Sequence, residues 1–198
     1  MDPLDKANIG TTGLAITRLG LGGAPMGGLF SDVEERQAYE TLSAAYKNGV
    51  RYFDTAPLYG SGKSERFFGE FLTTVPRDEF VLSSKVGRLL DNKEPVAEEG
   101  LYVNVPKMKV QYDYSRDGVL RSIEDSLHRL DLDRIDIAFI HDPDENFDIA
   151  MDEALPTLAD LRSQGVLKAI GAGMNQWEML ADFARKGDFD CFLLAGRY

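Results

Sequence analysis

The sequence has little cysteine and no long apolar run. Only one of its 198 residues is a cysteine, Cys191, which excludes an internal disulfide and leaves too few thiols for a zinc cluster. No apolar run approaches the roughly 18 residues that a membrane-spanning helix needs. The first five residues carry neither the basic region nor the apolar region of a secretory signal peptide. These absences predict a cytoplasmic protein with no membrane partner.

Positive charge and histidine are also scarce. Lys and Arg number 22 against 33 Asp and Glu, for a net charge of −11, which argues against nucleic acid or an anionic membrane surface as a partner. Of the two histidines, His128 falls on the polar side of a predicted helix and is expected to be solvated. A metal-dependent hydrolase usually draws on several histidines. We therefore expect no metal site.

The chain alternates short apolar runs with longer segments of helical periodicity. The short runs, several of them rich in β-branched or aromatic residues, predict strands over residues 19–22, 50–53, 80–83, 135–140, 169–171 and 191–194. The helical segments are residues 33–48, 115–130, 155–164 and 177–186. Strand followed by helix, repeated, predicts an α/β fold of βα units around a parallel sheet.

Two α/β architectures fit this alternation: an open doubly wound sheet and a (β/α)₈ TIM barrel. The glycine-rich segment 20–28 lacks the G-x-G-x-x-G fingerprint of the doubly wound fold, because Pro25 takes the place of the third glycine.

Two segments lie outside the strand–helix alternation. Residues 9–16 are predicted to form a hairpin that closes one end of the sheet. Residues 88–114 form a long irregular connection, and loops of that length are usually functional or disordered.

Polar residues at the ends of successive predicted strands favour the barrel. Asp54, Lys85, His141 and Asn175 each follow a strand, and Tyr59 lies five residues beyond Asp54. In a barrel these strand ends converge on the face where catalytic residues are found. Each residue alone has a structural explanation, such as a helix cap or a lysine whose ammonium reaches solvent. The full set is hard to explain in that way, because burying unpaired charges is costly.

The residue types suit a reaction between an alcohol and a carbonyl. A tyrosine hydroxyl has a pKa of about 10 and is a poor acid or base at neutral pH. A nearby ammonium lowers that pKa, and a carboxylate can hold the ammonium in place. A histidine beside the tyrosine can orient a substrate oxygen. Such a reaction also needs a hydride carrier, which no side chain supplies.

The segment 54–60, with Lys85 and His141 at later strand ends, resembles the aldo-keto reductases over essentially the whole chain. The resemblance implies a (β/α)₈ barrel that binds NAD or NADP across its mouth, and a single oxidoreductase domain over residues 1–198. Tyr59 would be the general acid/base and Lys85 would lower its pKa. Asp54 would pair with Lys85, and His141 would position the substrate oxygen.

The resemblance also implies cofactor contacts, for which we expect four residues. Asn175 would hold the nicotinamide carboxamide, one position away from the Ser-Asn pair of many relatives. Asp54, Met26 and Gly23 would line the nicotinamide end of the site. A complete barrel takes about 250 residues, and about six of its eight βα units can be counted here. We therefore expect a C-terminally incomplete domain that is inactive by itself.

Within the family, the resemblance is to the branch of D-threo-aldose (L-fucose type) and pyridoxal dehydrogenases. It rests on the long insertion after Lys85, on residues 173–177 and on the ending 193–198. It implies oxidation of an aldose at C1. Two alternatives stay open: a pyridoxal or aldehyde oxidoreductase with the same site, and a module that binds nucleotide and a protein partner without turnover.

Overall fold

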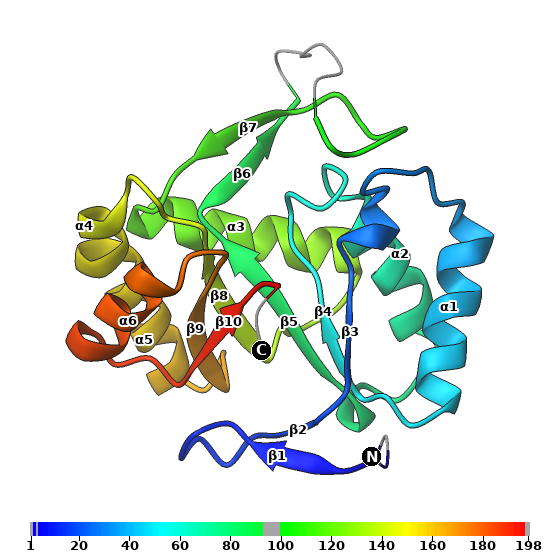
Figure 1. Ribbon diagram of the computed structural model, residues 1–198, viewed down its shortest axis with the longest axis horizontal. Helices are drawn as coiled ribbons and strands as arrows, with labels where there is room; N and C mark the ends of the chain where they lie inside the picture. The colour runs from blue at the N-terminus through cyan, green and yellow to red at the C-terminus, as the bar shows by residue number, and fades with distance from the viewer. Residues whose placement is uncertain (1, 3, 93–99, 197–198) are drawn as a thin grey trace.

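A curled six-stranded parallel sheet forms the middle of the molecule (Figure 1). The computed structural model describes residues 2, 4–92 and 100–196. The strands lie in the order β10-β9-β8-β5-β4-β3, and every neighbouring pair is parallel. Their bounds are Gly20–Gly22 (β3), Tyr52–Asp54 (β4), Val81–Val86 (β5), Ile137–His141 (β8), Ala169–Met174 (β9) and Cys191–Leu194 (β10). All six predicted strands are confirmed.

Helices connect these strands. The longer ones are Glu35–Lys47 (α1), Lys63–Leu72 (α2), Arg116–Leu130 (α3), Leu155–Ser163 (α5) and Trp177–Lys186 (α6). Shorter turns are Pro25–Gly27 (η1), Arg77–Glu79 (η2), Phe147–Ile149 (α4) and the π-helical Ala150–Ala154 (η3). Helices α1 and α2 lie beside β3 and β4, and α4 to α6 lie beside β9 and β10 (Figure 1). Four of the five longer helices match the predicted ranges within two residues.

The sequence pattern missed α2. Its buried positions include Ser64 and Glu65 as well as phenylalanines, and Gly69 lies in its middle. An apolar stripe is the sequence signal for an amphipathic helix, and buried polar residues interrupt it here. Gly69 is needed for packing, because a Cβ on it would lie 2.3 Å from the carbonyl oxygen of Leu130 on α3.

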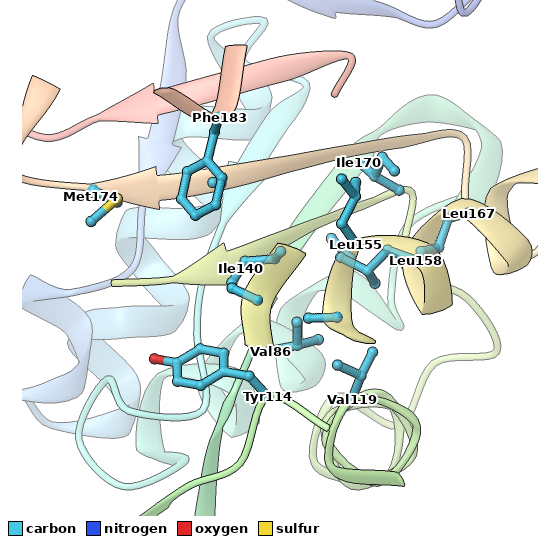
Figure 2. Close-up of a cluster of buried hydrophobic side chains, with 14 of the residues drawn as sticks. Val86, Tyr114, Val119, Ile140, Leu155, Leu158, Leu167, Ile170, Met174 and Phe183 are labelled. Atoms are coloured by element: carbon cyan, nitrogen blue, oxygen red, sulfur yellow. The ribbon is translucent and has the colours of Figure 1, made fainter. Parts of the chain in front are cut away.

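The two faces of the sheet pack against different partners. On β8, Ala138 and Ile140 face the cluster under α3, α5 and α6, whose members include Val119, Leu158 and Phe183 (Figure 2). The alternate residues of β8, Ile137 and Phe139, face inward. Successive side chains of a strand point to opposite faces. Helices on one face and a packed interior on the other are typical of a barrel, not of a doubly wound sheet.

Two antiparallel hairpins lie at opposite ends of the sheet (Figure 1). Strand β1 (Lys6–Asn8) pairs with β2 (Ala15–Thr17) across the amino ends of the strands, which confirms the predicted hairpin. Ile9, Leu14 and Ile16 of this hairpin pack against the inward-facing residues of the sheet.

The second hairpin, β6 (Arg88–Asp91) with β7 (Lys109–Tyr112), projects from the carboxyl ends of the strands. The connection 88–114 was expected to be irregular, but it begins and ends as a paired hairpin. Its residues 93–99 lie outside the described part of the chain.

Candidate active site

The centre of the site is a buried ion pair between neighbouring strands. Asp54 ends β4, and Lys85 is the fifth residue of β5. The parallel register places Asp54 opposite Ser83, so Lys85, two residues on, points to the same face. The Lys85 ammonium, in a side chain only 2 % exposed, lies 2.8 Å from Oδ2 of Asp54 and donates to the carbonyl oxygen of Thr55 at 2.9 Å. Ser83 donates to Oδ1 of Asp54 at 2.7 Å.

Tyr59 is carried to this ion pair by the turn that follows β4. The turn depends on Gly60, whose φ is +64° and which approaches Gly27 so closely that a Cβ would lie 2.1 Å from the Gly27 carbonyl oxygen. The Lys85 ammonium lies 4.6 Å from the centroid of the Tyr59 ring. The ring of His141 meets it edge-on, with centroids 5.8 Å apart. Asp54, Tyr59, Lys85 and His141, predicted from sequence, thus lie together.

Burial and charge act on the tyrosine and the lysine in opposite ways. Burial raises the pKa of Tyr59, while the charge of Lys85 and a hydrogen bond from it lower that pKa, and the net result lies above the usual value of 10. Burial lowers the pKa of Lys85, but Asp54 and Tyr59 together raise it more, so it lies above its usual value. At neutral pH the site therefore holds a phenol beside a charged ammonium.

His141 is neutral in this environment. Burial, followed by the positive charges of Lys85 and Arg88, holds its pKa well below the usual 6.5. Its Nε2 lies 3.5 Å from Oδ2 of Asp142. Its Nδ1 is buried and has no hydrogen-bond partner in the described part of the chain. A neutral imidazole can hydrogen-bond a substrate oxygen without adding charge to the site.

The residues expected to contact a cofactor differ in their surroundings. Asn175 follows β9 and is exposed, as an amide that receives a ligand must be. Gly23 is buried, and its N–H donates to the Asp54 carbonyl oxygen at 2.7 Å. The Met26 side chain is 5 % exposed and packs in the core with residues of α1 and α2. Gly22 is the last residue of β3, and a Cβ added to it would have no other atom within 4 Å. The exposed amide and this open space fit a nicotinamide at the carboxyl ends of the strands.

Sequence reasoning missed a second layer of polar residues behind the site. Ser84 donates to Oε1 of Glu65 at 2.8 Å, and the fully buried Glu65 forms an ion pair with Arg129 at 2.6 Å. Next to His141, Arg88 forms an ion pair with Asp142 at 2.9 Å. The adjacent polar residues Ser83 and Ser84 inside a buried strand were the available signal for this layer.

Among residues 2, 4–92 and 100–196, no group of three or more His, Cys, Asp or Glu side chains is placed to hold a metal ion. Within the same residues, no helix is long and apolar enough to cross a membrane.

Comparison with known proteins places the chain in one family. The sequence profile of the Aldo/keto reductase family matches residues 18–198. A D-threo-aldose 1-dehydrogenase from a Pseudomonas species is 43 % identical over 192 residues, which cover 94 % of this chain and 58 % of that protein. A pyridoxal 4-dehydrogenase from Microbacterium luteolum is 38 % identical over 216 residues, covering 98 % of this chain and 62 % of that protein.

Solved structures agree with this placement. A glycerol dehydrogenase from Gluconobacter oxydans superposes with a TM-score of 0.71 at 28 % identity, covering 95 % of this chain and 54 % of that one. The chain thus spans about three fifths of the length of the two curated relatives named above. Its sheet and helices are the corresponding part of a (β/α)₈ barrel. The chain belongs to the aldo/keto reductase family.

Proposed function

We propose that the protein to which this chain belongs is an NAD(P)-dependent oxidoreductase that oxidises an aldose of the D-threo or L-fucose type at C1. The observation that carries the proposal is the buried Asp54–Lys85 pair, at 2.8 Å, beside Tyr59 and His141 at the carboxyl ends of the strands. Tyr59, Lys85 and His141 all have displaced pKa values, and such groups gathered in one place are typical of catalytic sites. The relative at 43 % identity, a D-threo-aldose 1-dehydrogenase, supports the substrate class.

Tyr59 is the proposed general acid/base. In oxidation its tyrosinate accepts the proton of the C1 hydroxyl, and in reduction its phenol donates a proton to the carbonyl oxygen. A bound nicotinamide supplies the hydride acceptor or donor at C1. Because burial raises the pKa of Tyr59, the phenol predominates at neutral pH and the tyrosinate increases as the pH rises. Oxidation should therefore become faster with rising pH, and reduction slower.

The other three residues of the site serve this proton transfer. Lys85 stabilises the tyrosinate through its charge and its hydrogen bond to Tyr59. Asp54 and the Thr55 carbonyl oxygen accept the other hydrogen bonds of the ammonium and so fix its position. Neutral His141 hydrogen-bonds the substrate oxygen.

The cofactor is held, on this proposal, by residues at the ends of the first, second and fifth βα strands. Asn175 bonds the carboxamide, and the turn with Gly23 and Met26 lines the nicotinamide end beside Asp54. The buried Met26 side chain supports the turn from the core, so its contribution comes through the backbone. Either NAD or NADP fits these residues.

A second candidate function is oxidation of pyridoxal by the same residues. It is favoured by the 38 % identity to a pyridoxal 4-dehydrogenase over 98 % of this chain. Pyridoxal offers an aromatic ring where an aldose offers several hydroxyl groups, so the two substrates require different surroundings for Tyr59.

The test is an assay of the full-length protein with NAD⁺ and with NADP⁺, given L-fucose, other D-threo-aldoses or pyridoxal. Formation of reduced nicotinamide with the aldoses, at a rate that rises with pH, is the expected result. Turnover with pyridoxal alone would support the second candidate. Binding of nucleotide without turnover of any of these compounds would contradict both and support a non-catalytic interaction module.

A further inference from the structure

A second tyrosine lies over Tyr59. Tyr102 belongs to the segment that joins β6 to β7, and its ring is tilted by 32° against that of Tyr59, with centroids 6.4 Å apart. The side chain is half-buried. Within the described residues, no hydrogen bond joins its hydroxyl to another group. A ligand at Tyr59 would therefore not have to displace a partner among the described residues to bond the Tyr102 hydroxyl.

Backbone pairing fixes the position of Tyr102. Tyr102 and Leu29 form an antiparallel bridge, and two backbone hydrogen bonds of 2.8 and 2.9 Å join residues 28–30 to residues 101–103. The approach is close at Gly28, whose φ is +94° and where a Cβ would lie 2.6 Å from the Val103 carbonyl oxygen. The segment is thus attached to the loop that follows η1.

A polar cluster strengthens this attachment. Lys63, at the start of α2 and 6 % exposed, donates to Oδ1 of Asp32 at 2.7 Å. Asn104 donates from Nδ2 to Oδ2 of the same carboxylate at 2.8 Å. One carboxylate therefore ties helix α2 to the segment that carries Tyr102. A ring held from two sides can contribute to recognition with little loss of conformational entropy on binding.

Asp142 offers a second polar group on the side of His141. It directly follows β8 in a strained conformation, with φ +37°. The Tyr114 hydroxyl holds this turn, because it lies 2.7 Å from the His141 carbonyl oxygen and 3.1 Å from that of Asp142. Figure 2 shows the Tyr114 hydroxyl directed away from the apolar cluster. Arg88 and His141 both approach Oδ2 of Asp142, and Oδ1 has no hydrogen bond to another described residue.

Tyr102 and Asp142 interact with the same site. Burial raises the pKa of Tyr102 most, the neighbouring Tyr59 raises it further, Arg88 lowers it and Asp142 raises it. Tyr59, Arg88 and Asp142 therefore each lie within electrostatic range of Tyr102. Tyr102 and Asp142 are both grouped around Tyr59, since its ring centroid lies 6.4 Å from that of Tyr102 and 5.8 Å from that of His141, the neighbour of Asp142.

We propose that the Tyr102 hydroxyl and Oδ1 of Asp142 form a subsite for substrate hydroxyl groups next to the reacting carbon, so that the site selects polyhydroxylated substrates over simple aldehydes. This inference rests on the proposed function, because the reacting carbon is placed at Tyr59. An aldose hydroxyl donates to Oδ1 of Asp142, and another exchanges a hydrogen bond with Tyr102. A simple aldehyde leaves both groups desolvated without a partner, which is the penalty by which polar sites reject analogues that lack a hydroxyl.

The test compares two aldehydes with three carbons each, which differ only in their hydroxyl groups. The full-length protein and its Tyr102→Phe variant reduce glyceraldehyde and propanal with reduced nicotinamide. Loss of one such hydrogen bond should lower kcat/KM for glyceraldehyde by about 10-fold or more. The kcat/KM for propanal should not fall and should rise, because the variant no longer leaves this hydroxyl desolvated without a partner. Tyr112→Phe is the matched control, because it removes an exposed hydroxyl of the same hairpin and keeps the ring beneath Arg88.

Other results would contradict either the subsite or the proposed function, and the two cases can be told apart. Equal losses for both aldehydes, or no loss for either, would overturn the subsite. Failure to oxidise L-fucose with NAD⁺ or NADP⁺ would contradict the proposed function. If the unmodified protein oxidises L-fucose but reduces neither three-carbon aldehyde, calorimetric titration with L-fucose tests the subsite. Weaker binding of L-fucose by Tyr102→Phe than by the unmodified protein would support it, and equal or absent binding would overturn it.

Discussion

Lys85 keeps its charge in the interior because three acceptors surround its ammonium. A lone ammonium at 2 % exposure would lose its proton or destabilise the fold. Asp54 accepts one hydrogen bond and supplies the compensating charge, the Thr55 carbonyl oxygen accepts another, and Tyr59 is the third. The same arrangement that satisfies the lysine brings the positive charge to the phenol on which the proposed chemistry depends.

Breaking this pair should therefore cost much more stability than breaking an ion pair on the surface. Asp54→Asn leaves the buried ammonium without its counter-charge, and we expect the free energy of unfolding to fall by about 3–5 kcal/mol. Glu40→Gln is the control, since Glu40 pairs with Arg36 on the exposed face of α1 and such pairs contribute about 0–1 kcal/mol. Urea unfolding of both variants measures the difference, and equal losses would contradict the role given to the buried pair.

His141 makes stability depend on pH. Its pKa in the folded protein is well below 6.5, so between that value and 6.5 the unfolded chain binds more protons than the folded one. Stability conferred by the neutral imidazole is complete above pH 6.5 and declines as the pH falls, by up to about 1.4 kcal/mol per pH unit. His141→Gln should flatten this part of the unfolding profile. A profile unchanged by the substitution would show that other groups cause the acid sensitivity.

At the scale of elements, helix α3 shows how local sequence sets a boundary. Ser115 precedes the helix in an extended conformation, and its hydroxyl accepts a hydrogen bond from the Gly118 N–H at 3.2 Å. The carboxylate of Asp113 accepts bonds from both the N–H and the hydroxyl of Ser115. The helix start is thus fixed by side chains close in the sequence, although the helix itself was predicted from its apolar periodicity.

Removal of this cap should weaken the fold by a moderate amount. Ser115→Ala leaves the Gly118 N–H without its acceptor, and caps of this kind are worth about 0.5–2 kcal/mol. The midpoint of thermal unfolding measures the loss. Ser163→Ala, at the exposed end of α5, is a serine control for which we expect little change, and a similar loss in both variants would contradict the capping role.

Hairpin β6–β7 shows where local sequence is not sufficient. Its paired strands are separated in sequence by residues 92–108, so no short turn motif marks the pairing. Tyr114 fills the space over Gly87, where a Cβ would lie 2.1 Å from its ring. Such a contact between residues 27 positions apart leaves no periodic trace in the sequence. Periodicity therefore predicted four helices and six strands, but neither α2 nor this hairpin.

At the scale of the whole molecule, topology explains why a site could be predicted at all. Parallel strands bring their carboxyl ends to one side of the sheet, so polar residues that end successive strands must approach one another. Asp54, Lys85 and His141 followed from this rule, and Tyr59 from the turn after β4. The partners Ser83, Arg88 and Asp142 did not, because their roles depend on side-chain directions that only the three-dimensional structure reveals.

The two ends of the sheet interior differ in the residues that line them. The amino ends of the strands are covered by hairpin β1–β2, whose residues Ile9, Leu14 and Ile16 pack against the inward-facing side chains. At the other end, polar and charged groups replace the apolar ones. One end of the sheet thus contributes stability, and the carboxyl end carries the residues of the proposed chemistry.

The most direct test of the account is the Tyr59→Phe variant of the full-length protein. The change removes the hydroxyl that exchanges the proton and keeps the ring beside Lys85 and His141. Oxidation of L-fucose should lose about 10²–10⁴-fold in kcat/KM, with folding and nucleotide binding intact. Tyr39→Phe, on the outer helix α1, should retain full activity. Turnover by Tyr59→Phe at the rate of the unmodified protein would contradict the role of Tyr59 and with it the proposed mechanism.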